Sequence, residues 1–600
     1  MERRVFLTLI FCTLFTLIYL KMTPKPEPSG QPVQAGETRP DELVGGAAGG
    51  SGQIPPAGAA GAPPAGAGNL VKTEVGEIAI EPFESDDLRI EFTNLGAAIT
   101  QVQLKKYRNS VTGAGSEDGP DWVSVLPGED RSFGPALTLR ENPTPTSPAV
   151  YGLDQYHWEV VRDEVEPGGA RVLEFRFETT DGYQFLKRFV CSPSEHFIRV
   201  AVGMNALGEQ ERESKKELLL RAAGGVADVQ RGQWTLKPQG VSMLQDQHGE
   251  ATVRHYTASE LEGSPKTDTA EGKSSIAWGG VSNLYFAVLL APDQPGTVNG
   301  VYLLAENEDR PEKIQAELMV PLVVARDGSL TEVSFRYFVG PKDPVLLEEQ
   351  GLETFLPLIE VDYGSWSSFR WINKLLLFVM RFFHGLVGNW GVSIILLTLL
   401  VRMCIFPVTR TQQVSMQRYS MKMQALKPKL DALKEKYKDK SQKFAQEQMK
   451  LLKEHNAKPP LLGCLSTLIT FPVFIGMFQI LRTSIELRQA PFAGWIGDLS
   501  LPDAMFQIPG LGFAFNLLPI LATAAFVGQM ALAPKPADPQ ARQQQKIMFI
   551  MPIVFGVMFY NYAAGLSLYM LTSSLYGMFE YKFIRQKFFP NPVAPVVPAK

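Results

Sequence analysis

The pattern of hydrophobic and polar positions divides the chain into two halves. Between residues 70 and 345, short segments alternate apolar and polar residues, as in LRIEF at 88–92, RVLEFRFET at 171–179 and HFIRVAVGM at 196–204. Gly, Asp and Pro turns separate these segments, and the combination predicts a β-sandwich with few helices over 70–350. After residue 385 the apolar runs lengthen to about 20 residues, the length of a membrane-spanning helix.

Five such runs predict a bundle of membrane spans that forms the core of the second half at 386–587. They cover residues 386–408, 461–481, 511–532, 547–563 and 566–583. The loop at 409–458 holds thirteen Lys and Arg against five Asp and Glu, and a short polar loop follows at 534–546. Positive loops remain in the cytoplasm, which orients the first of the five spans from outside to inside.

The amino terminus gives the same orientation independently. MERR precedes an apolar run from Val5 to Leu20, and no small-x-small cleavage site follows it. Residues 1–22 therefore predict an uncleaved membrane anchor rather than a signal peptide, with Arg3 and Arg4 in the cytoplasm. Together with the five later runs, this predicts six spans with both chain ends in the cytoplasm.

Three connecting segments complete the domain plan. Residues 23–69 consist largely of Pro, Gly, Ala and Ser and predict a disordered linker. Residues 361–385 predict an amphipathic helix in the membrane interface, or alternatively a buried connector helix. Its apolar face comprises Trp366, Phe369, Ile372, Leu376, Val379 and Phe383, and its polar side Ser367, Arg370, Asn373, Lys374 and Arg381. Residues 588–600 form a short carboxyl-terminal tail.

Arg402 is the one full charge in the first span of the core. A central Arg costs about 2.5–3.5 kcal/mol on insertion scales, so its presence needs a reason. One interpretation ends the helix near Pro407 and lets Arg402 reach the headgroups. The other places Arg402 in a water-filled groove, with Thr398 one turn away on the same face. The sequence leaves both open.

Polar side chains in the later spans present a similar choice. Gln479 and Asn516 lie in or beside apolar runs, and the last span carries hydroxyls at Ser567, Tyr569, Thr572, Ser573 and Ser574. Hydroxyls in helices can bond to the preceding turn, which would make them ordinary packing residues. Alternatively, these side chains line one wet groove with Arg402.

The basic loop predicts a helical hairpin. Leu426, Leu430, Leu433 and Tyr437 give one apolar face, Phe444, Met449 and Leu452 another, and a polar break falls near 439–441. Its cationic surface suits a polyanion such as ribosomal RNA or anionic lipid, or a targeting protein, although a merely solvated hairpin has the same pattern.

Composition excludes several classes of function. The net charge is −4, and the six His and four Cys show no HExxH motif, zinc spacing or disulfide framework. We expect no metal, cofactor or catalytic residue, and no enzyme activity. A transporter using Arg402 as a counter-charge would predict an internal repeat of spans, and none is visible.

Several motifs together resemble the YidC/Oxa/Alb family of membrane protein insertases, in its Gram-negative form with a large periplasmic domain. They are VDYG at 361–364, VGNWGVSIILLTLLVR at 387–402, LKPKL at 426–430, ELRQAPFAGWIGDLS at 486–500, QQKIMFIMP at 544–552, GLSLYMLTSSL at 565–575 and, more weakly, WGGVSNLYFAVLL at 278–290. The resemblance implies a periplasmic all-β supersandwich and an α-helical five-span bundle in the bacterial inner membrane. It also implies a hydrophilic groove closed towards the periplasm.

The resemblance also implies site residues and partners. Arg402 matches the groove arginine, and Thr398, Phe474, Tyr569 and Met570 match positions beside an incoming helix, although some relatives have an aromatic residue at 570. Gln479, Asn516 and Ser573 extend this groove. The hairpin residues expected to contact the ribosome or a targeting protein are Lys422, Lys427, Lys429, Lys434 and Lys436. Implied partners are nascent membrane proteins, the Sec translocon, the ribosome, the signal-recognition-particle receptor and the bilayer, with the chain itself a monomer.

Overall fold

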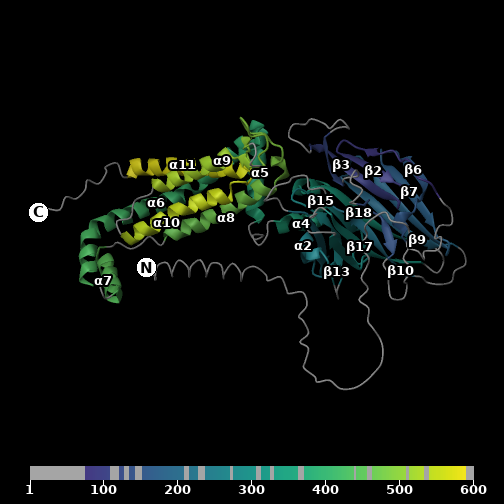
Figure 1. Cartoon of the computed structure of the whole chain (residues 1–600), viewed down its shortest axis with the longest axis horizontal. Coiled ribbons are helices and arrows are strands. Elements are labelled where there is room, and N and C mark those ends of the chain that lie inside the picture. Colours follow the sequence, from purple (N-terminus) through teal and green to yellow (C-terminus); the bar gives the residue numbers. More distant parts are fainter. Residues whose placement is uncertain are drawn as a thin grey trace, which may run out of the picture.

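A computed structural model gives the fold of two parts, a β-rich part and a helical part, which lie end to end along the long axis (Figure 1). The structure describes residues 75–108, 121–126, 134–141, 152–207, 215–226, 237–270, 274–305, 313–324, 330–362, 370–437, 441–455, 462–508, 513–532 and 539–588. The predicted anchor, linker and most of the carboxyl-terminal tail lie outside these residues.

The β-rich part contains three sheets, and the strand pairs within them are antiparallel. The strands are β1 (Phe83–Glu84), β2 (Leu88–Thr93), β3 (Ala98–Arg108), β4 (Trp122–Leu126), β5 (Leu139–Glu141), β6 (Glu159–Val165), β7 (Arg171–Glu178), β8 (Tyr183–Cys191), β9 (Phe197–Ala206), β10 (Lys215–Ala223), β11 (Gln239–Gln245), β12 (Ala251–Thr257), β13 (Lys266–Thr269), β14 (Ser275–Ser282), β15 (Phe286–Pro292), β16 (Gly300–Ala305), β17 (Ile314–Val323) and β18 (Thr331–Pro341). The nine-stranded sheet has the order β12-β11-β14-β15-β18-β9-β8-β7-β6, the five-stranded sheet β13-β16-β17-β10-β5, and the four-stranded sheet β1-β2-β3-β4. Three short helices accompany them, α2 (Ala258–Leu261), α3 (Pro344–Glu349) and α4 (Leu356–Asp362).

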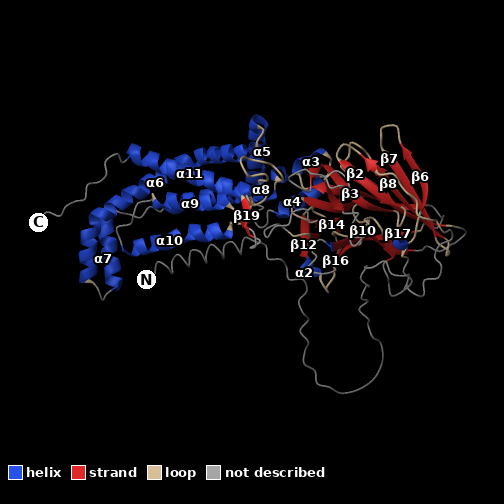
Figure 2. Cartoon of the chain, turned by 45° about the horizontal axis from the view of Figure 1, so that its top comes forward, coloured by secondary structure: helices blue, strands red, loops and turns tan. Residues whose placement is uncertain are grey.

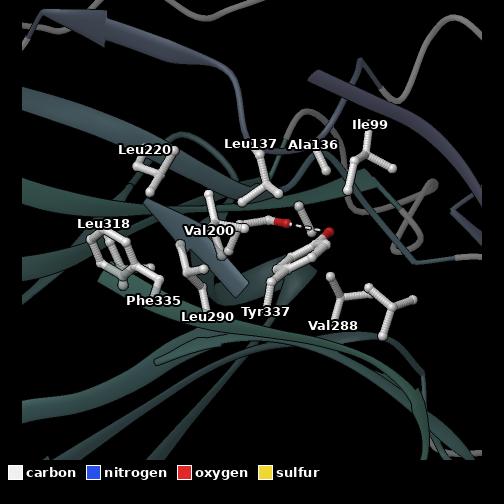
Figure 3. Close-up of a cluster of buried hydrophobic side chains, with 14 of the residues drawn as sticks. Ile99, Ala136, Leu137, Val200, Leu220, Val288, Leu290, Leu318, Phe335 and Tyr337 are labelled. Atoms are coloured by element: carbon white, nitrogen blue, oxygen red, sulfur yellow. Dashed lines mark hydrogen bonds between the residues drawn. The ribbon is translucent and has the colours of Figure 1, made fainter. Parts of the chain in front are cut away.

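The alternating segments form strands as predicted, and β2, β7 and β9 confirm the three quoted examples. Alternation places every second side chain on the inner face, where the sheets bury one apolar core. Tyr337 of β18 is fully buried there, and its hydroxyl donates a hydrogen bond of 2.9 Å to the Ala222 carbonyl oxygen (Figure 3). Leu290 and Phe335 pack in the same cluster.

The helical part is drawn in blue beside the red sheets in Figure 2. Its elements are α5 (Arg370–Val387), α6 (Trp390–Lys436), α7 (Ser441–Glu454), α8 (Leu462–Thr483), α9 (Leu517–Ala531), α10 (Pro539–Met558), α11 (Ala564–Phe588) and the short strands β19 (Phe506–Ile508) and β20 (Phe513–Phe515). Helix α11 contacts α6, α8 and α9, α5 contacts α6 and α8, and α10 contacts α9. Because α11 contacts three other helices, its side chains lie at the centre of the bundle.

Helix α6 does not end near Pro407, although one of the two interpretations of Arg402 assumed that it does. It continues through Pro407 and Pro428 to Lys436, so the first arm of the basic hairpin is the same helix as the Arg402 span. Proline removes one backbone donor and crowds the preceding turn, but it does not end a helix that its neighbours support. Asn389 begins α6, and its side-chain oxygen accepts a hydrogen bond from the Val392 backbone N–H.

Two other predicted boundaries were also wrong. Residues 513–515 form β20, which pairs with β19, and the helix expected from 511 begins at Leu517. The polar loop predicted at 534–546 is helical from Pro539, where α10 begins. Hydrophobicity alone does not distinguish a short apolar strand from the first turn of an apolar helix. It also does not distinguish a polar helix end from a polar loop.

Helix α5 has a different polar side from the one predicted. Ile372, Leu376 and Met380 are buried against the bundle, whereas Trp371 and Phe378 are more than 60% exposed. Asn373 is buried, and a Cβ atom added to Gly476 of α8 would lie 2.9 Å from its Oδ1 atom. The helix therefore has two apolar faces, one packed on α8 and one outward. The second is the face expected of a helix in contact with lipid.

The two parts of the chain meet beside the end of α8. Ile485 follows α8 in a 3-10 turn (Ile485–Leu487) and belongs to the core of the β-rich part. The Tyr285 hydroxyl donates a hydrogen bond of 3.4 Å to the Arg482 carbonyl oxygen. Arg381 of α5 forms ion pairs with Glu486 and, at 3.0 Å, with Asp343 at the start of α3. We call Arg381, Glu486 and Asp343 the interdomain ion cluster.

Among the described residues, one helix, Trp390–Lys436, is both long and apolar enough to cross a membrane. Shorter apolar helical segments occur at Phe471–Thr483, Leu517–Ala531 and Phe549–Met558. The number of spans therefore stays a prediction.

Candidate functional site

Arg402 lies where α6 faces α11. Its Nε atom donates a hydrogen bond of 2.9 Å to the Ser573 hydroxyl, which also accepts from Nη2. Arg402 is half-buried and Ser573 is 5% exposed. Over the stretches of chain described here, no carboxylate lies within ion-pairing distance of Arg402. The guanidinium is thus held by a neutral hydroxyl, and its positive charge has no contacting counter-charge.

Thr398 lies one turn before Arg402 and is 1% exposed. Its hydroxyl donates a hydrogen bond of 2.6 Å to the Ile394 carbonyl oxygen in the preceding turn of α6. This is the ordinary packing role that the sequence left open for hydroxyls in these helices. Thr398 therefore lies on the same helical face as Arg402, and its hydroxyl already donates a hydrogen bond to the backbone.

Aromatic and flexible side chains surround the same contact. Tyr569 of α11 lies one turn before Ser573 and is 7% exposed, and its ring centroid is 6.3 Å from that of Phe474 in α8. Phe474 and Met570 are half-buried and pack against the same apolar cluster. The structure therefore brings together Arg402, Ser573, Tyr569, Phe474 and Met570 from three helices.

A second set of polar contacts lies along the same interface between α6 and α11, which we call the seam. The sequence did not lead us to predict these contacts. The Thr409 hydroxyl donates to Glu580 Oε1 at 2.5 Å, and Gln413 Nε2 donates to the same oxygen at 3.3 Å. Gln417 Nε2 then donates to the Tyr581 hydroxyl at 3.2 Å. We call these contacts, together with Arg402–Ser573, the polar ladder.

The spacing of the polar ladder could have revealed it. Thr409 follows Arg402 by seven residues on α6, and Glu580 follows Ser573 by seven residues on α11. Positions seven apart share one helical face. Two helices that touch at one pair of positions therefore touch again at the next, and Glu580 is accordingly buried, with 3% of its surface exposed.

The contacts described for Asn516 lie outside the polar ladder and join other segments, so its place in the groove stays a prediction. Asn516 precedes α9 and is 1% exposed. Its Nδ2 atom donates to the Tyr560 carbonyl oxygen at 3.0 Å, and its Oδ1 atom accepts from the Ala504 N–H at 2.9 Å. Asn516 therefore ties together the loops around α9, α10 and α11.

Gln479 lies on α8 and is 8% exposed. Its backbone carbonyl oxygen accepts a hydrogen bond of 2.9 Å from the Thr483 hydroxyl. It shares this helix with Phe474, so it lies on the same wall of the bundle but further along it. The contacts described for Gln479 do not join it to Arg402.

An apolar hollow of about 480 Å³ runs beside the polar ladder, between α6 and α11. Its lining residues are Ile395, Leu399, Leu568, Leu571, Thr572, Leu575, Tyr576 and Phe579. Polar contacts and an apolar surface therefore lie side by side along one helix seam.

The predicted hairpin is present in the described residues as the end of α6 and α7, which contact each other. Leu426 is buried in it, whereas Met449 is 60% exposed, contrary to the predicted apolar face. The Lys429 Nζ atom lies 3.1 Å from His455 Nε2 across the hairpin. The predicted contact lysines are all exposed: Lys422, Lys427, Lys429, Lys434 and Lys436.

Comparison with known proteins identifies the family of the chain. Residues 82–379 match the family model described as YidC periplasmic domain, and residues 382–591 match the one described as 60Kd inner membrane protein. A relative named membrane protein insertase YidC from Pelobacter propionicus is 28% identical over 506 residues, covering 82% of this chain and 84% of the relative. One with the same name from Aeromonas hydrophila is 37% identical over 366 residues, covering 58% and 61%.

A solved structure titled as an active YidC insertase with the first transmembrane domain resolved is 17% identical, with a TM-score of 0.30, and covers 85% of this chain and 94% of that one. The two family models define this chain as a bacterial inner-membrane protein with a periplasmic domain. More specifically, it belongs to the YidC family of membrane protein insertases.

Proposed function

We propose that this chain inserts newly made proteins into the inner membrane, and assists their folding and assembly, through a hydrophilic groove centred on Arg402. Besides family membership, one observation carries the proposal. The half-buried Arg402 guanidinium is held by the Ser573 hydroxyl instead of a carboxylate. A charge held this way remains available to a visiting acidic group, whereas a close ion pair would already satisfy it.

The groove and the apolar hollow would act in sequence. A polar tail that enters a hydrated groove near Arg402 crosses a shorter apolar barrier than one that crosses the bilayer. The apolar segment that follows the tail can then contact the hollow between α6 and α11 and move into lipid. Burial of apolar surface supplies about 25 cal/mol per Å² for this step, so no nucleotide hydrolysis is required.

Individual residues have separate roles in this proposal. Arg402 attracts the acidic tail, and Ser573 orients the guanidinium. Tyr569, Phe474 and Met570 contact the incoming helix. Thr398 packs one turn from Arg402 on the α6 wall of the groove, and Gln479 lies on the α8 wall. Attraction in such a groove must be weak, because tight binding would prevent release of the substrate.

We further propose the topology and partners that follow from the charge pattern. Helices α6, α8, α9, α10 and α11 cross the membrane together with an amino-terminal anchor, both chain ends lie in the cytoplasm, and the chain works alone as a monomer or beside the Sec translocon. The exposed hairpin lysines contact the ribosome or the signal-recognition-particle receptor. Replacing all five lysines by Gln should weaken ribosome cosedimentation and reduce its salt dependence.

The central test is complementation in cells depleted of their own insertase. Wild type, Arg402→Lys and Arg402→Ala are compared for insertion of a single-span reporter whose outward tail is acidic. We expect Lys to support insertion and Ala to reduce it about tenfold or more, with less effect on a neutral tail, because the charge acts on the acidic group.

Arg418→Ala is the matched control, because Arg418 is an exposed arginine on the same helix. It should insert both reporters as well as wild type. If Arg402→Ala inserted the acidic reporter at the wild-type level, Arg402 would be a structural residue, and the groove proposal would be wrong.

A further inference from the structure

Glu580 is a buried carboxylate beside the proposed groove, and the insertion model above does not use it. It is 3% exposed on α11, and both of its described partners, Thr409 and Gln413, come from α6. Burying a carboxylate between two helices costs free energy unless hydrogen bonds or charges compensate for it. A Gln at this position would keep hydrogen bonds to both helices without a charge, so the charge itself needs a reason.

Burial between two helices disfavours a charge on Glu580, and two donated hydrogen bonds and a nearby cation oppose that cost. The Gln413 Nε2 group can only donate a hydrogen bond, and the Thr409 hydroxyl donates a second one to the same carboxylate oxygen. Arg402 is close enough to interact with Glu580 electrostatically, although the two are not in ion-pair contact. Glu580 therefore places a negative charge on the same seam as the positive charge of Arg402.

The position of Glu580 along the seam places its charge nearer to the basic hairpin than the charge of Arg402. Thr409 follows Arg402 by seven residues, or about 10 Å along α6, in the direction of the basic hairpin. A tail that approaches Arg402 from the hairpin end therefore passes Glu580 first. An acidic tail meets repulsion before attraction, whereas a tail with a basic residue meets attraction first.

From this order of charges we infer that Glu580 is a specificity-determining residue of the groove. It weakens the preference for acidic outward-bound tails that Arg402 creates, and it reduces the disadvantage of tails that carry a Lys or Arg. The inference rests on the proposed insertase function and concerns how strongly the groove prefers acidic tails over basic ones.

The test compares Glu580→Gln with wild type in the complementation assay. Three reporters differ only in whether their outward tails carry added Asp, Ser or Lys residues. Removing one partly screened charge should raise insertion of the acidic tail relative to the neutral tail about threefold to tenfold. The same variant should lower insertion of the basic tail relative to the neutral one. If both ratios stayed within twofold of wild type, the inference would be overturned.

Two control variants separate charge from structure. Gln417→Leu removes the polar-ladder contact to Tyr581 and leaves the described partners of Glu580 in place, so it should change all three reporters equally. Glu348→Gln removes an exposed carboxylate in the β-rich part and should change none of them. If Gln417→Leu reproduced the ratios of Glu580→Gln, the effect would be structural and the inference would fail. If wild type inserted no reporter at all, the proposed function itself would be wrong.

Discussion

At the scale of single residues, Lys187 shows how a buried charge can join separate segments. Its Nζ atom donates hydrogen bonds to the carbonyl oxygens of Gly96, Ala97 and Leu137 at 2.8, 2.9 and 2.6 Å, and it lies 5.0 Å from the centre of the Trp158 ring. Three donors of one ammonium group thus meet three acceptors from two loops of the β-rich part. Alternation along β8 predicts that position 187 points inward, but only the fold brings those loops together.

Replacing Lys187 by Met should destabilise the β-rich part by about 2–4 kcal/mol, because it leaves three buried carbonyl groups without their donor. Urea unfolding of the full chain in detergent, followed by tryptophan fluorescence, measures the change. Lys106→Met is the matched control, since Lys106 is exposed and pairs with Asp87 on the surface. A loss for Lys187→Met no larger than that of the control would contradict the role described here.

Cys191 gives a second prediction at this scale. Burial raises the pKa of its thiol to about 12, and its side chain is 3% exposed. Only the thiolate reacts, so at pH 8 the folded thiol should alkylate about a thousandfold more slowly than an unfolded one. Iodoacetamide labelling of a variant that keeps Cys191 as its one cysteine, with and without urea, measures the ratio. Equal rates in the two states would show that Cys191 is accessible in the folded protein.

At the scale of elements, the start of α6 depends on close packing against a loop. A Cβ atom added to Gly391 would lie 2.1 Å from Phe492 Cδ2, whereas one added to Gly385 of α5 would meet no atom within 4 Å. The Asn389 Nδ2 group also donates to the Phe492 carbonyl oxygen at 3.1 Å. The loop after α8 therefore has to approach the backbone of α6 closely.

We expect Gly391→Ala to lower the free energy of unfolding by about 1–3 kcal/mol, because the Phe492 ring has to move. Gly385→Ala should be neutral or raise it by up to about 1 kcal/mol through helix propensity. Thermal unfolding of both variants in the same detergent measures the difference. Destabilisation of the same size in both would argue against the packing explanation.

Long apolar patterns predicted which helices are present, but they did not predict where those helices begin and end. The apolar period identified α6, α8, α9 and α11, but helix α6 passes Pro407 because contacts with α11 continue beyond it at Thr409, Gln413 and Gln417. The expectation that proline ends a helix rests on local steric clashes. The contacts that continue α6 come instead from a helix more than 150 residues away in sequence, so the local sequence does not reveal them.

At the scale of the whole molecule, the interdomain ion cluster joins the β-rich part to the helical part. Arg381, Glu486 and Asp343 come from three segments that are far apart in the sequence. All three side chains are partly buried, so their ion pairs are less screened than surface pairs. Lys374, also on α5, makes an exposed ion pair with Glu348 at 3.8 Å and serves as the comparison.

Arg381→Met should loosen this junction and speed amide hydrogen exchange about tenfold in α3 and in the turn after α8, because two carboxylates lose their shared partner. Lys374→Met should change exchange there by less than twofold, since an exposed pair contributes little. Hydrogen exchange with mass spectrometry on the full chain provides the measurement. Equal exchange in Arg381→Met and wild type would show that the apolar contacts of Ile485 suffice to hold the junction.

The sequence by itself determined the division into an outer β-rich part and a helical membrane part and the basic hairpin, and it singled out Arg402 as a charge within an apolar run. These follow from composition, local period and the cost of a charge in an apolar run, which are properties of short windows. Only the tertiary structure decided that Arg402 contacts Ser573, that Asn516 ties loops together, and that Glu580 lies on the seam with Arg402. Those facts depend on which helix faces which. That choice is made by packing between residues distant in the chain, and no local pattern carries it.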